Sequence, residues 1–586
     1  MTAAVGTILA TSALPAIAAD RLHLSLGPIE QSVNIRDLEQ FAYQGTLTAA
    51  LRPYAPLLSD SLRRALTTSL PLAPEASDVL MQDLVQSTSG QQLMSTLLTV
   101  LPDSTPTEIE ATLSQVIQQT QGISLLAFLR AYPTSDVTVS VASAIAVASQ
   151  FNLPYWQSHA LNSLLEQELT DASPIPETPF DPSKPGYARV RQQSLTFRDR
   201  QRKRTIPVDL YWSRQHHGPL VVISHGFAAD RRFLGYLARH LASHGLTVAA
   251  LEHPGSNITW LSRMALGETG AAGLADLLPM QEFIDRPKDV SFLLDELSRL
   301  DRYSALLRHQ LDVENVTVIG HSLGGYTALA LSGATLDLDG LVDFCKSRSL
   351  LGLSPADWLQ CAAVDLSSVP DLRDPRVAQV VALNPLMGRI FGETGLSKVQ
   401  VPSLILSASE DPITPAVSQQ LLPYTHFQME SRYLVTAIGA THLSMGDPRN
   451  LNYALVQNGL LRERRWNETE PLRNLVRSLS LSFIKQQTPE AELYAPFLSS
   501  SYVQSWSTSS IQTRLVRDLP PKLEAWLRMG AVPLEGVVAS TIAKPRKPNY
   551  RRHHAAMLEH LGKSLPLLMI FPPSLLPLGV FKFRRR

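Results

Sequence analysis

A regular alternation of short apolar segments and helix-length segments runs from residue 187 to residue 438 and limits this chain to few folds. The apolar segments have the length and the branched side chains typical of β-strands. Continuous apolar runs such as residues 220–223 indicate central strands that are buried on both faces. We expect strands at about 187–198, 204–213, 219–224, 246–251, 316–321, 378–384, 402–408 and 432–438.

The spacing of these strands predicts how they pair. The segments 187–198 and 204–213 are close enough in sequence to form an antiparallel hairpin. The later segments are separated by stretches long enough for a crossover helix, which predicts parallel pairing. We therefore expect an α/β fold with an eight-stranded, mostly parallel sheet flanked by helices.

The chain of 586 residues has room for more than this one sheet. Residues 20–172 show helical patterns, with little strand signal after residues 22–29, and predict an all-helical module to which no function can be attached. One of its helices should begin after Thr105 and run over residues 106–119. A proline-rich stretch at 174–185 predicts the boundary of a catalytic domain over residues 183–535.

Both ends of the chain differ in composition from the rest. Residues 1–19 form an apolar run that ends in small residues, which is typical of a signal peptide and predicts export to the periplasm or outside the cell. A buried helix is the alternative, because no Lys or Arg precedes the run. Residues 536–586 are basic and rich in proline, which breaks a spanning helix. We expect a disordered tail there, with contact to a membrane surface as the alternative.

Charge and cysteine content exclude some functions and leave others open. The 52 basic and 52 acidic residues balance, so overall charge gives no support for a nucleic-acid partner. Cys345 and Cys361 are the two cysteines, and either one disulfide or two free thiols fits the sequence. His, Cys and acidic residues do not occur at the spacing of metal ligands. We therefore expect no metal and no other cofactor.

A motif in the middle of the alternating region carries the chemistry. Residues 320–324, Gly-His-Ser-Leu-Gly, match the pattern G-x-S-x-G directly after a predicted strand and at the start of a predicted helix. In this setting the glycines permit the crowded turn that lifts the serine hydroxyl above the sheet. The context favours Ser322 as a nucleophile over a serine in an ordinary loop.

A serine hydroxyl is a weak nucleophile until a positioned base removes its proton. His442 follows the last predicted strand and is the candidate base, whereas His426 precedes that strand and is the weaker candidate. Asp411 follows the seventh predicted strand and is the candidate acid that orients the imidazole. The alternatives are a solvated loop histidine and an aspartate that caps the next turn.

Acyl transfer also requires hydrogen-bond donors for the oxyanion. The backbone N–H groups of Phe227, after the third strand, and Leu323, after the nucleophile, are the candidates. An insertion at about 335–377, which carries both cysteines, is expected to form a cap over the site. Trp260 and Trp358 lie in segments expected to overhang the site, where they either line an acyl pocket or only pack.

Residues 219–257, with the motif VTVIGHSLGGYTAL, resemble bacterial dienelactone-hydrolase-like proteins and secreted platelet-activating-factor acetylhydrolases. The resemblance implies an α/β-hydrolase fold and cleavage of small carboxylic esters or phospholipid acyl esters through an acyl-serine, without a cofactor. In the acetylhydrolases the acid follows the sixth strand, where this chain has Asn384. The acid must then lie at Asp411, and this departure weakens the phospholipid assignment. The N-terminal module is similar to one that precedes hydrolases in some photosynthetic bacteria.

Three functions are therefore compared. An esterase acting on a lipid or another small ester explains every motif. A catalytically silent hydrolase fold that serves as a binding protein is the second, because fold alone does not fix function. The third is an amide or peptide hydrolase, because the pocket rather than the catalytic residues selects the leaving group.

Overall fold

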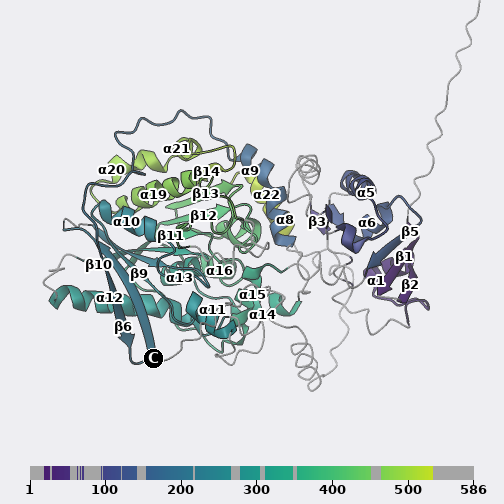
Figure 1. The fold of residues 1–586 in the computed structure, drawn as a ribbon, viewed down its shortest axis with the longest axis horizontal. Helices are drawn as coiled ribbons and strands as arrows, with labels where there is room; N and C mark the ends of the chain where they lie inside the picture. The colour runs from purple at the N-terminus through teal and green to yellow at the C-terminus, as the bar shows by residue number, and fades with distance from the viewer. Residues whose placement is uncertain are drawn as a thin grey trace, which may run out of the picture. The chain divides into compact units, whose positions relative to one another are not determined.

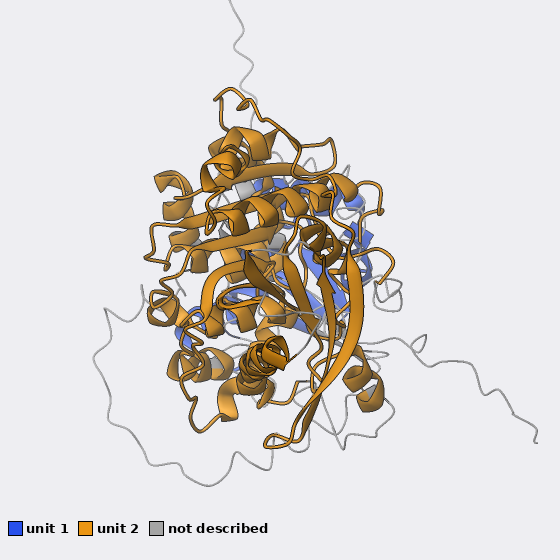
Figure 2. Ribbon diagram, turned by 90° about the vertical axis from the view of Figure 1, so that its left-hand side faces the viewer, with its two compact units in different colours: residues 1–151, 349–351 blue, residues 152–348, 352–586 orange. Residues whose placement is uncertain are grey.

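The computed structural model describes residues 19–26, 29–52, 63, 66, 69–71, 94–95, 97–119, 122–140, 153–214, 218–265, 278–303, 311–347, 353–450 and 463–531. The chain forms two compact units, residues 1–151 with 349–351 and residues 152–348 with 352–586 (Figure 2). Each unit has its own core of buried apolar side chains.

The second unit is built on a nine-stranded sheet, which confirms the mostly parallel sheet and adds one strand to the eight expected. The strands lie in the order β14-β13-β12-β11-β10-β8-β9-β7-β6 (Figure 1). Their bounds are β6 Arg191–Asp199, β7 Arg204–Trp212, β8 Pro219–Ser224, β9 Thr247–Leu251, β10 Asp312–His321, β11 Val377–Leu383, β12 Ser403–Ala408, β13 Arg432–Ile438 and β14 Gln512–Val516.

Strand pairing follows the pattern expected from the sequence. The strands from β9 to β13 across the sheet pair in parallel, and β6 and β7 form the antiparallel hairpin at one edge. The additional strand β14 pairs antiparallel with β13 at the other edge. It was not predicted from the sequence because it has only five residues, lies outside the region in which strands and helices alternate, and carries Arg514 at its centre.

Helices cover both faces of this sheet (Figure 1). On one face, α10 (Gly235–Ser243) and α19 (Glu470–Lys485) bury apolar side chains against the strands. On the other lie α12 (Glu282–Tyr303) and α13 (Leu323–Leu331). Every residue of β8 and β12 is buried, as expected for strands covered on both sides. The other helices described in this unit are α8 Leu153–Ala160, α9 Asn162–Glu168, α11 Ile258–Ala265, α14 Leu338–Ser347, α15 Pro355–Cys361, η3 Ala362–Asp365, α16 Gly392–Leu396, η4 Val417–Leu421, α17 Leu422–Tyr424, α20 Ala491–Tyr494, η5 Ala495–Leu498, α21 Ser500–Gln504 and α22 Pro521–Ala531.

The first unit is not the all-helical module expected over residues 20–172. It contains a three-stranded sheet in the order β2-β1-β5 and a short β3-β4 pair. Strand β5 has alternating valines, a strand pattern that is easily missed in so short a segment. The elements are β1 Arg21–Leu26, β2 Ile29–Asn34, α1 Ile35–Gln44, β3 Ser69–Pro71, α5 Pro106–Gln119, β4 Gly122–Ser124, α6 Leu125–Ala131 and β5 Asp136–Ser140.

Helix α5 confirms the prediction of a helix that begins after Thr105. Its bounds are those expected from the sequence, and Thr105 and Glu108 exchange hydrogen bonds across the first turn. The Thr105 N–H donates to Glu108 Oε2 over 2.8 Å, and the Glu108 N–H donates to Thr105 Oγ1 over 3.3 Å. This reciprocal capping satisfies N–H groups that the helix itself leaves unpaired.

The boundary expected at the proline-rich stretch is wrong. The helices α8 and α9 and the stretch at 174–185 all belong to the second unit. The side chain of Gln504 exchanges hydrogen bonds with the backbone of Asp171, at 2.9 and 3.0 Å. Phe180 packs against Tyr494 and Phe497 with ring centroids 5.2 and 5.1 Å apart. The proline-rich segment therefore packs against the rest of the second unit and is not a free linker.

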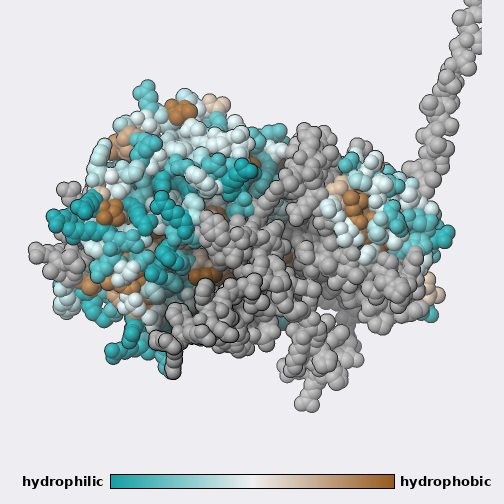
Figure 3. Space-filling model, in the orientation of Figure 1, coloured by the Kyte–Doolittle hydropathy of each residue, from teal (hydrophilic) through white to brown (hydrophobic). Residues whose placement is uncertain are grey.

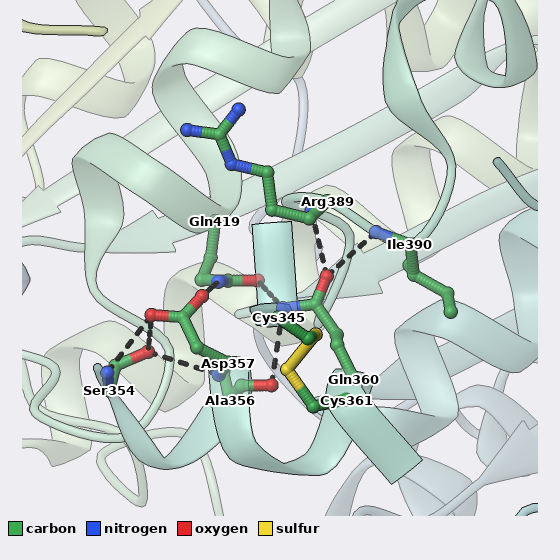
Figure 4. The surroundings of a disulfide bond; sticks show 9 residues. All are labelled: Cys345, Ser354, Ala356, Asp357, Gln360, Cys361, Arg389, Ile390 and Gln419. Atoms are coloured by element: carbon green, nitrogen blue, oxygen red, sulfur yellow. Dashed lines mark hydrogen bonds between the residues drawn. A yellow bond between two sulfur atoms is a disulfide. The ribbon is translucent and has the colours of Figure 1, made fainter. Parts of the chain in front are cut away.

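The insertion at 335–377 contains α14, α15 and the short helix η3, and Cys345 and Cys361 form a disulfide between α14 and α15 (Figure 4). Helix α15 begins at a capping box made by Ser354 and Asp357. The side chain of Gln360 is fully buried and accepts hydrogen bonds from two backbone N–H groups in the segment after β11. The disulfide therefore joins two helices within the insertion, and the buried Gln360 amide fastens the insertion to the segment after β11.

The described surface shows no large apolar face on the side drawn in Figure 3, where hydrophobic residues are scattered among hydrophilic ones. Within the described ranges, no helix is long and apolar enough to cross a bilayer. Residues 1–18 and the whole of the expected tail, 536–586, lie outside the described residues. The expectations of a signal peptide and of a basic tail therefore stay predictions.

Candidate active site

Ser322 stands in a sharp turn between β10 and α13, with φ of 55° and ψ of −119°. A non-glycine residue rarely adopts a positive φ, so the surrounding structure must hold it there. The Ser322 N–H donates to the carbonyl of Leu383 over 2.9 Å, which ties the turn to the end of β11. Gly324 lets α13 begin against β8, because a Cβ at this position would lie 2.0 Å from the carbonyl oxygen of Ser224.

Asp411 and His442 are brought together by the loops that follow β12 and β13. These neighbouring strands are parallel, so both loops leave the same edge of the sheet. The distance between His442 Nδ1 and Asp411 Oδ2 is 2.6 Å, and both side chains are buried. An ionised carboxylate only accepts hydrogen bonds, so Nδ1 carries the proton and Nε2 has a lone pair available to take one.

Hydrogen bonds fix the orientation of the Asp411 carboxylate. Its Oδ1 accepts from the backbone N–H groups of Ile413 and Thr414, each over 2.8 Å. The Thr414 hydroxyl lies 2.7 Å from Asp411 Oδ2 and 3.2 Å from His442 Nδ1. The acid is thus held against the imidazole by its own loop, as expected for a group that orients a catalytic base.

Asn384, the position to which the resemblance pointed for the acid, makes other contacts. Its side chain accepts from the Ala408 N–H over 2.9 Å and donates to the His442 carbonyl over 3.4 Å. It therefore joins the backbone of β12 to the backbone of the histidine loop. Asp411 is the carboxylate that the structure brings to the imidazole.

Two further side chains hold the histidine loop. His321, directly before the nucleophile, donates from Nε2 to the carbonyl of His442 over 2.9 Å. Glu463 accepts hydrogen bonds from the Thr441 hydroxyl and from the Leu443 N–H, on either side of His442. Burial raises the pKa of Glu463 and lowers that of His321 well below its usual range. The loop is therefore fixed on both flanks.

The turn at residues 225–228, called the oxyanion turn below after the role expected from the sequence, lies against Ser322. A Cβ at Gly226 would stand 3.1 Å from Cβ of Ser322. Within the described residues, the N–H of Phe227 donates no hydrogen bond. Leu323 is the first residue of α13, and its N–H has no acceptor within that helix. Ala228 is held at a positive φ of 57°. Two available N–H donors therefore flank Ser322.

Ser322 and His442 do not share a hydrogen bond in the described part of the chain. Such bonds are often long without substrate and tighten when it binds. The ring of His321 packs against that of His442, with the two centroids 4.6 Å apart. Ser322 and His442 are 3% and 4% exposed, so most of each residue is covered by its neighbours.

An apolar cluster adjoins the oxyanion turn. Leu261 and Met264, one helical turn apart on α11, pack with Ala228, Phe227 and Ile258. The two tryptophans expected to line a pocket are not part of this cluster. Trp260 is half-buried on α11, and Trp358, on α15, is 37% exposed.

The insertion touches the loop that carries the acid. The N–H of Ala356, in the first turn of α15, donates to the carbonyl of Ile413 over 3.0 Å. Gln419 in η4 donates to Asp357 over 3.0 Å (Figure 4). The disulfide-linked helix therefore supports the segment just after Asp411.

Several residues of this site were not predicted from the sequence. Thr414, Glu463 and His321 contact the acid or the histidine loop, and none belongs to a motif that names it. Of the three, only His321 lies within a recognised motif, and it occupies a position of G-x-S-x-G at which any residue is allowed. Among the residues that the structure describes, no group of three or more His, Cys or acidic residues could hold a metal ion.

Three features together are typical of one class of protein. They are the strand order, the strained turn at Ser322 after the fifth expected strand, and the later loops that carry Asp411 and His442. The chain belongs to the α/β-hydrolase superfamily. Residues 219–384 match the family described as alpha/beta hydrolase fold. Residues 18–140, in the first unit, match the family described as alpha/beta hydrolase of unknown function (DUF1400).

A relative of known identity adds to this placement. Platelet-activating factor acetylhydrolase of the dog, Canis lupus familiaris, is 31% identical over 137 residues. The match covers 19% of this chain and 31% of the acetylhydrolase. The chain therefore spans about a third of that relative's length.

Proposed function

We propose that the protein is a serine hydrolase that cleaves carboxylic esters, either small acyl esters or acyl chains of phospholipids. The observation that carries the proposal is the 2.6 Å contact between His442 Nδ1 and Asp411 Oδ2 beside the strained turn that holds Ser322. The similarity to an acetylhydrolase supports an ester substrate.

In the proposed reaction, His442 Nε2 takes the proton of the Ser322 hydroxyl as Oγ attacks the ester carbonyl carbon. The negative charge that develops on the carbonyl oxygen is stabilised by the N–H groups of Phe227 and Leu323. The imidazolium, stabilised by Asp411, then gives its proton to the leaving alcohol, and the acyl group stays on Ser322. Water, activated by His442, hydrolyses this acyl-serine and restores the enzyme.

The apolar cluster beside the oxyanion turn supports an apolar acyl group. Leu261 and Met264 are buried, and their cluster includes Phe227, whose N–H is a proposed oxyanion donor. A chain bound to that cluster would place its carbonyl near the donor. Trp260 and Trp358 remain proposed as outer parts of the same pocket.

The proposal is tested by labelling purified protein with a fluorophosphonate probe and mapping the modified residue by mass spectrometry. Ser322 should be labelled, and Ser322→Ala should lose label and lower kcat by at least about a thousandfold. p-Nitrophenyl esters from acetyl to palmitoyl, assayed beside it, separate a short-acyl esterase from a lipase. A folded protein without label or turnover would overturn the proposal and favour a binding protein. Turnover of p-nitroanilides in preference to esters would favour an amide hydrolase.

A further inference from the structure

A second serine, histidine and aspartate lie directly below the oxyanion turn. His253 Nε2 is 2.9 Å from Ser224 Oγ, and His253 Nδ1 is 3.0 Å from Asp289 Oδ2. All three side chains are fully buried. Burial lowers the pKa of His253 well below its usual range, so the ring is neutral. Its Nδ1–H then donates to Asp289, and its Nε2 accepts from the Ser224 hydroxyl.

This constellation has no access for a substrate. Ser224 is the last residue of β8 and has no exposed surface, unlike Ser322. Its Oγ also accepts from Nη2 of Arg286 over 3.3 Å. Both hydrogen-bonding functions of the hydroxyl are therefore occupied, and a structural role must explain why so polar a group is buried.

Arg286 on α12 connects this group to both ends of the oxyanion turn. Its fully buried guanidinium donates from Nη2 to the carbonyl of His225, where the turn begins. Its Nη1 donates to Ser256 Oγ over 2.7 Å. The carbonyl of Ser256 accepts from the N–H of Ala228, where the turn ends, over 2.9 Å.

The same guanidinium also reaches the helix that carries the second donor. Arg286 Nε donates to Thr327 Oγ1 over 3.1 Å. The Thr327 hydroxyl in turn donates to the carbonyl of Leu323 over 3.0 Å. One rigid, planar group therefore contacts, through short chains of hydrogen bonds, the two elements that carry the Phe227 and Leu323 N–H groups.

Ion pairs anchor this arrangement to the edge of the sheet. Asp289 accepts from Arg204 at 2.8 and 2.7 Å and from Arg202 at 2.8 Å. Glu282 accepts from the Ser256 hydroxyl and from Arg204, each over 2.7 Å. These carboxylates compensate the buried guanidinium, as a buried charge requires.

We propose that Arg286, with Ser224, His253 and Thr327 as its buried partners, is the positioning residue of the oxyanion hole. It sets the spacing between the N–H groups of Phe227 and Leu323, and it contacts no reacting atom itself. The inference rests on the proposed serine hydrolase function and explains why a polar group of this size is buried beneath the turn.

The most conservative test is Thr327→Val, which keeps the shape of the side chain and removes the hydroxyl between Arg286 and Leu323. The matched control is Thr317→Val in β10, an equally buried threonine whose hydroxyl donates to Gln379 over 3.1 Å, away from the turn. Arg286→Lys is the second variant, because it keeps the charge and loses the planar fork of donors.

Each variant is assayed with an oxoester, p-nitrophenyl acetate, and with the matching thionoester. The thiocarbonyl sulfur is a weak hydrogen-bond acceptor, so thionoester hydrolysis depends little on the oxyanion donors. Thr327→Val should lower kcat for the oxoester about tenfold, with KM within about twofold. The thionoester rate and the melting temperature should match those of Thr317→Val, and Arg286→Lys should show a larger loss of the same kind.

An equal loss on both esters, or no loss beyond that of Thr317→Val, would overturn the inference. If Arg286→Lys does not fold, Thr327→Val decides alone. Wild-type turnover and labelling at Ser322 establish the proposed function independently, so these outcomes separate the two proposals. Absence of wild-type turnover would remove both.

Discussion

At the scale of single residues, the site depends on which carboxylate faces the histidine. The acid loop after β12 supplies Asp411, whereas the neighbouring Glu410 lies 3.6 Å from His159 and 3.5 Å from Arg464. Adjacent carboxylates in one loop therefore have separate partners. A carboxylate that holds the imidazole in one tautomer and stabilises its cation is needed in the transition state rather than for substrate binding.

Asp411→Asn should therefore lower kcat by about 10²-fold to 10⁴-fold with little change in KM. Glu410→Gln is the matched control, and its kcat should stay within about threefold of the wild-type value. Steady-state kinetics with a p-nitrophenyl ester measures both. Equal losses in the two variants would mean that kcat depends on the conformation of the loop and not on the carboxylate of Asp411.

At the scale of elements, the disulfide between α14 and α15 stabilises the insertion that supports the acid loop. Cys345 and Cys361 are separated by 16 positions. Closing a loop of this size removes about 3 kcal/mol of conformational freedom from the unfolded insertion in the chain-entropy account. Such a bridge is expected to persist in an oxidising compartment.

Replacing both cysteines with serine should therefore speed hydrogen exchange of the α15 amides, measured by mass spectrometry, while amides of α10 keep their protection. Wild-type protein under reductant serves as a second sample without the bridge and should show the same change. Unaltered exchange in α15 would mean that its capping box and buried amides hold the insertion without the disulfide.

The strands of the structure show which parts of the fold could be predicted from the sequence. The bounds of β8 and β13 were predicted without error because buried parallel strands are continuous apolar runs between turns. Strands β5 and β14 were missed because five residues give a weak pattern, and an edge strand gains its partner only in the folded sheet.

The same distinction holds within the site. Ser322 could be proposed because its motif has a fixed local setting, and Asp411 and His442 because they follow strands in a known order. Arg286 was not found, because one arginine in a charged helix is usually solvated. Only three-dimensional packing reveals that its guanidinium is fully buried.

At the scale of the whole molecule, the hydrolase unit buries several neutral histidines. Burial lowers the pKa of His225, His253 and His321 well below the usual value. The unfolded chain binds a proton at each of these sites below about pH 6.5, and the folded chain does not. The stability from these groups is therefore fully present above that pH and is lost as the pH falls.

The free energy of unfolding should fall between about pH 6.5 and pH 5 with a slope approaching about 1.4 kcal/mol per pH unit for each histidine. Denaturant unfolding of the full chain at a series of pH values, followed by tryptophan fluorescence, measures this slope. Carboxylates with lowered pKa values, such as Asp374, act at lower pH, whereas Glu463, whose pKa is raised by burial, takes up its proton first in the folded chain and reduces the slope. A constant free energy across this window would contradict neutral buried histidines.

The proposed reaction requires one covalent intermediate, an acyl-serine at residue 322. The direct test is to mix the protein rapidly with p-nitrophenyl acetate, quench it with acid and locate the acetyl group by peptide mass spectrometry. We predict acetylation of Ser322 with a burst of p-nitrophenol of about one per protein molecule, absent in Ser322→Ala. Acetylation of another residue, or turnover retained by Ser322→Ala, would contradict the account.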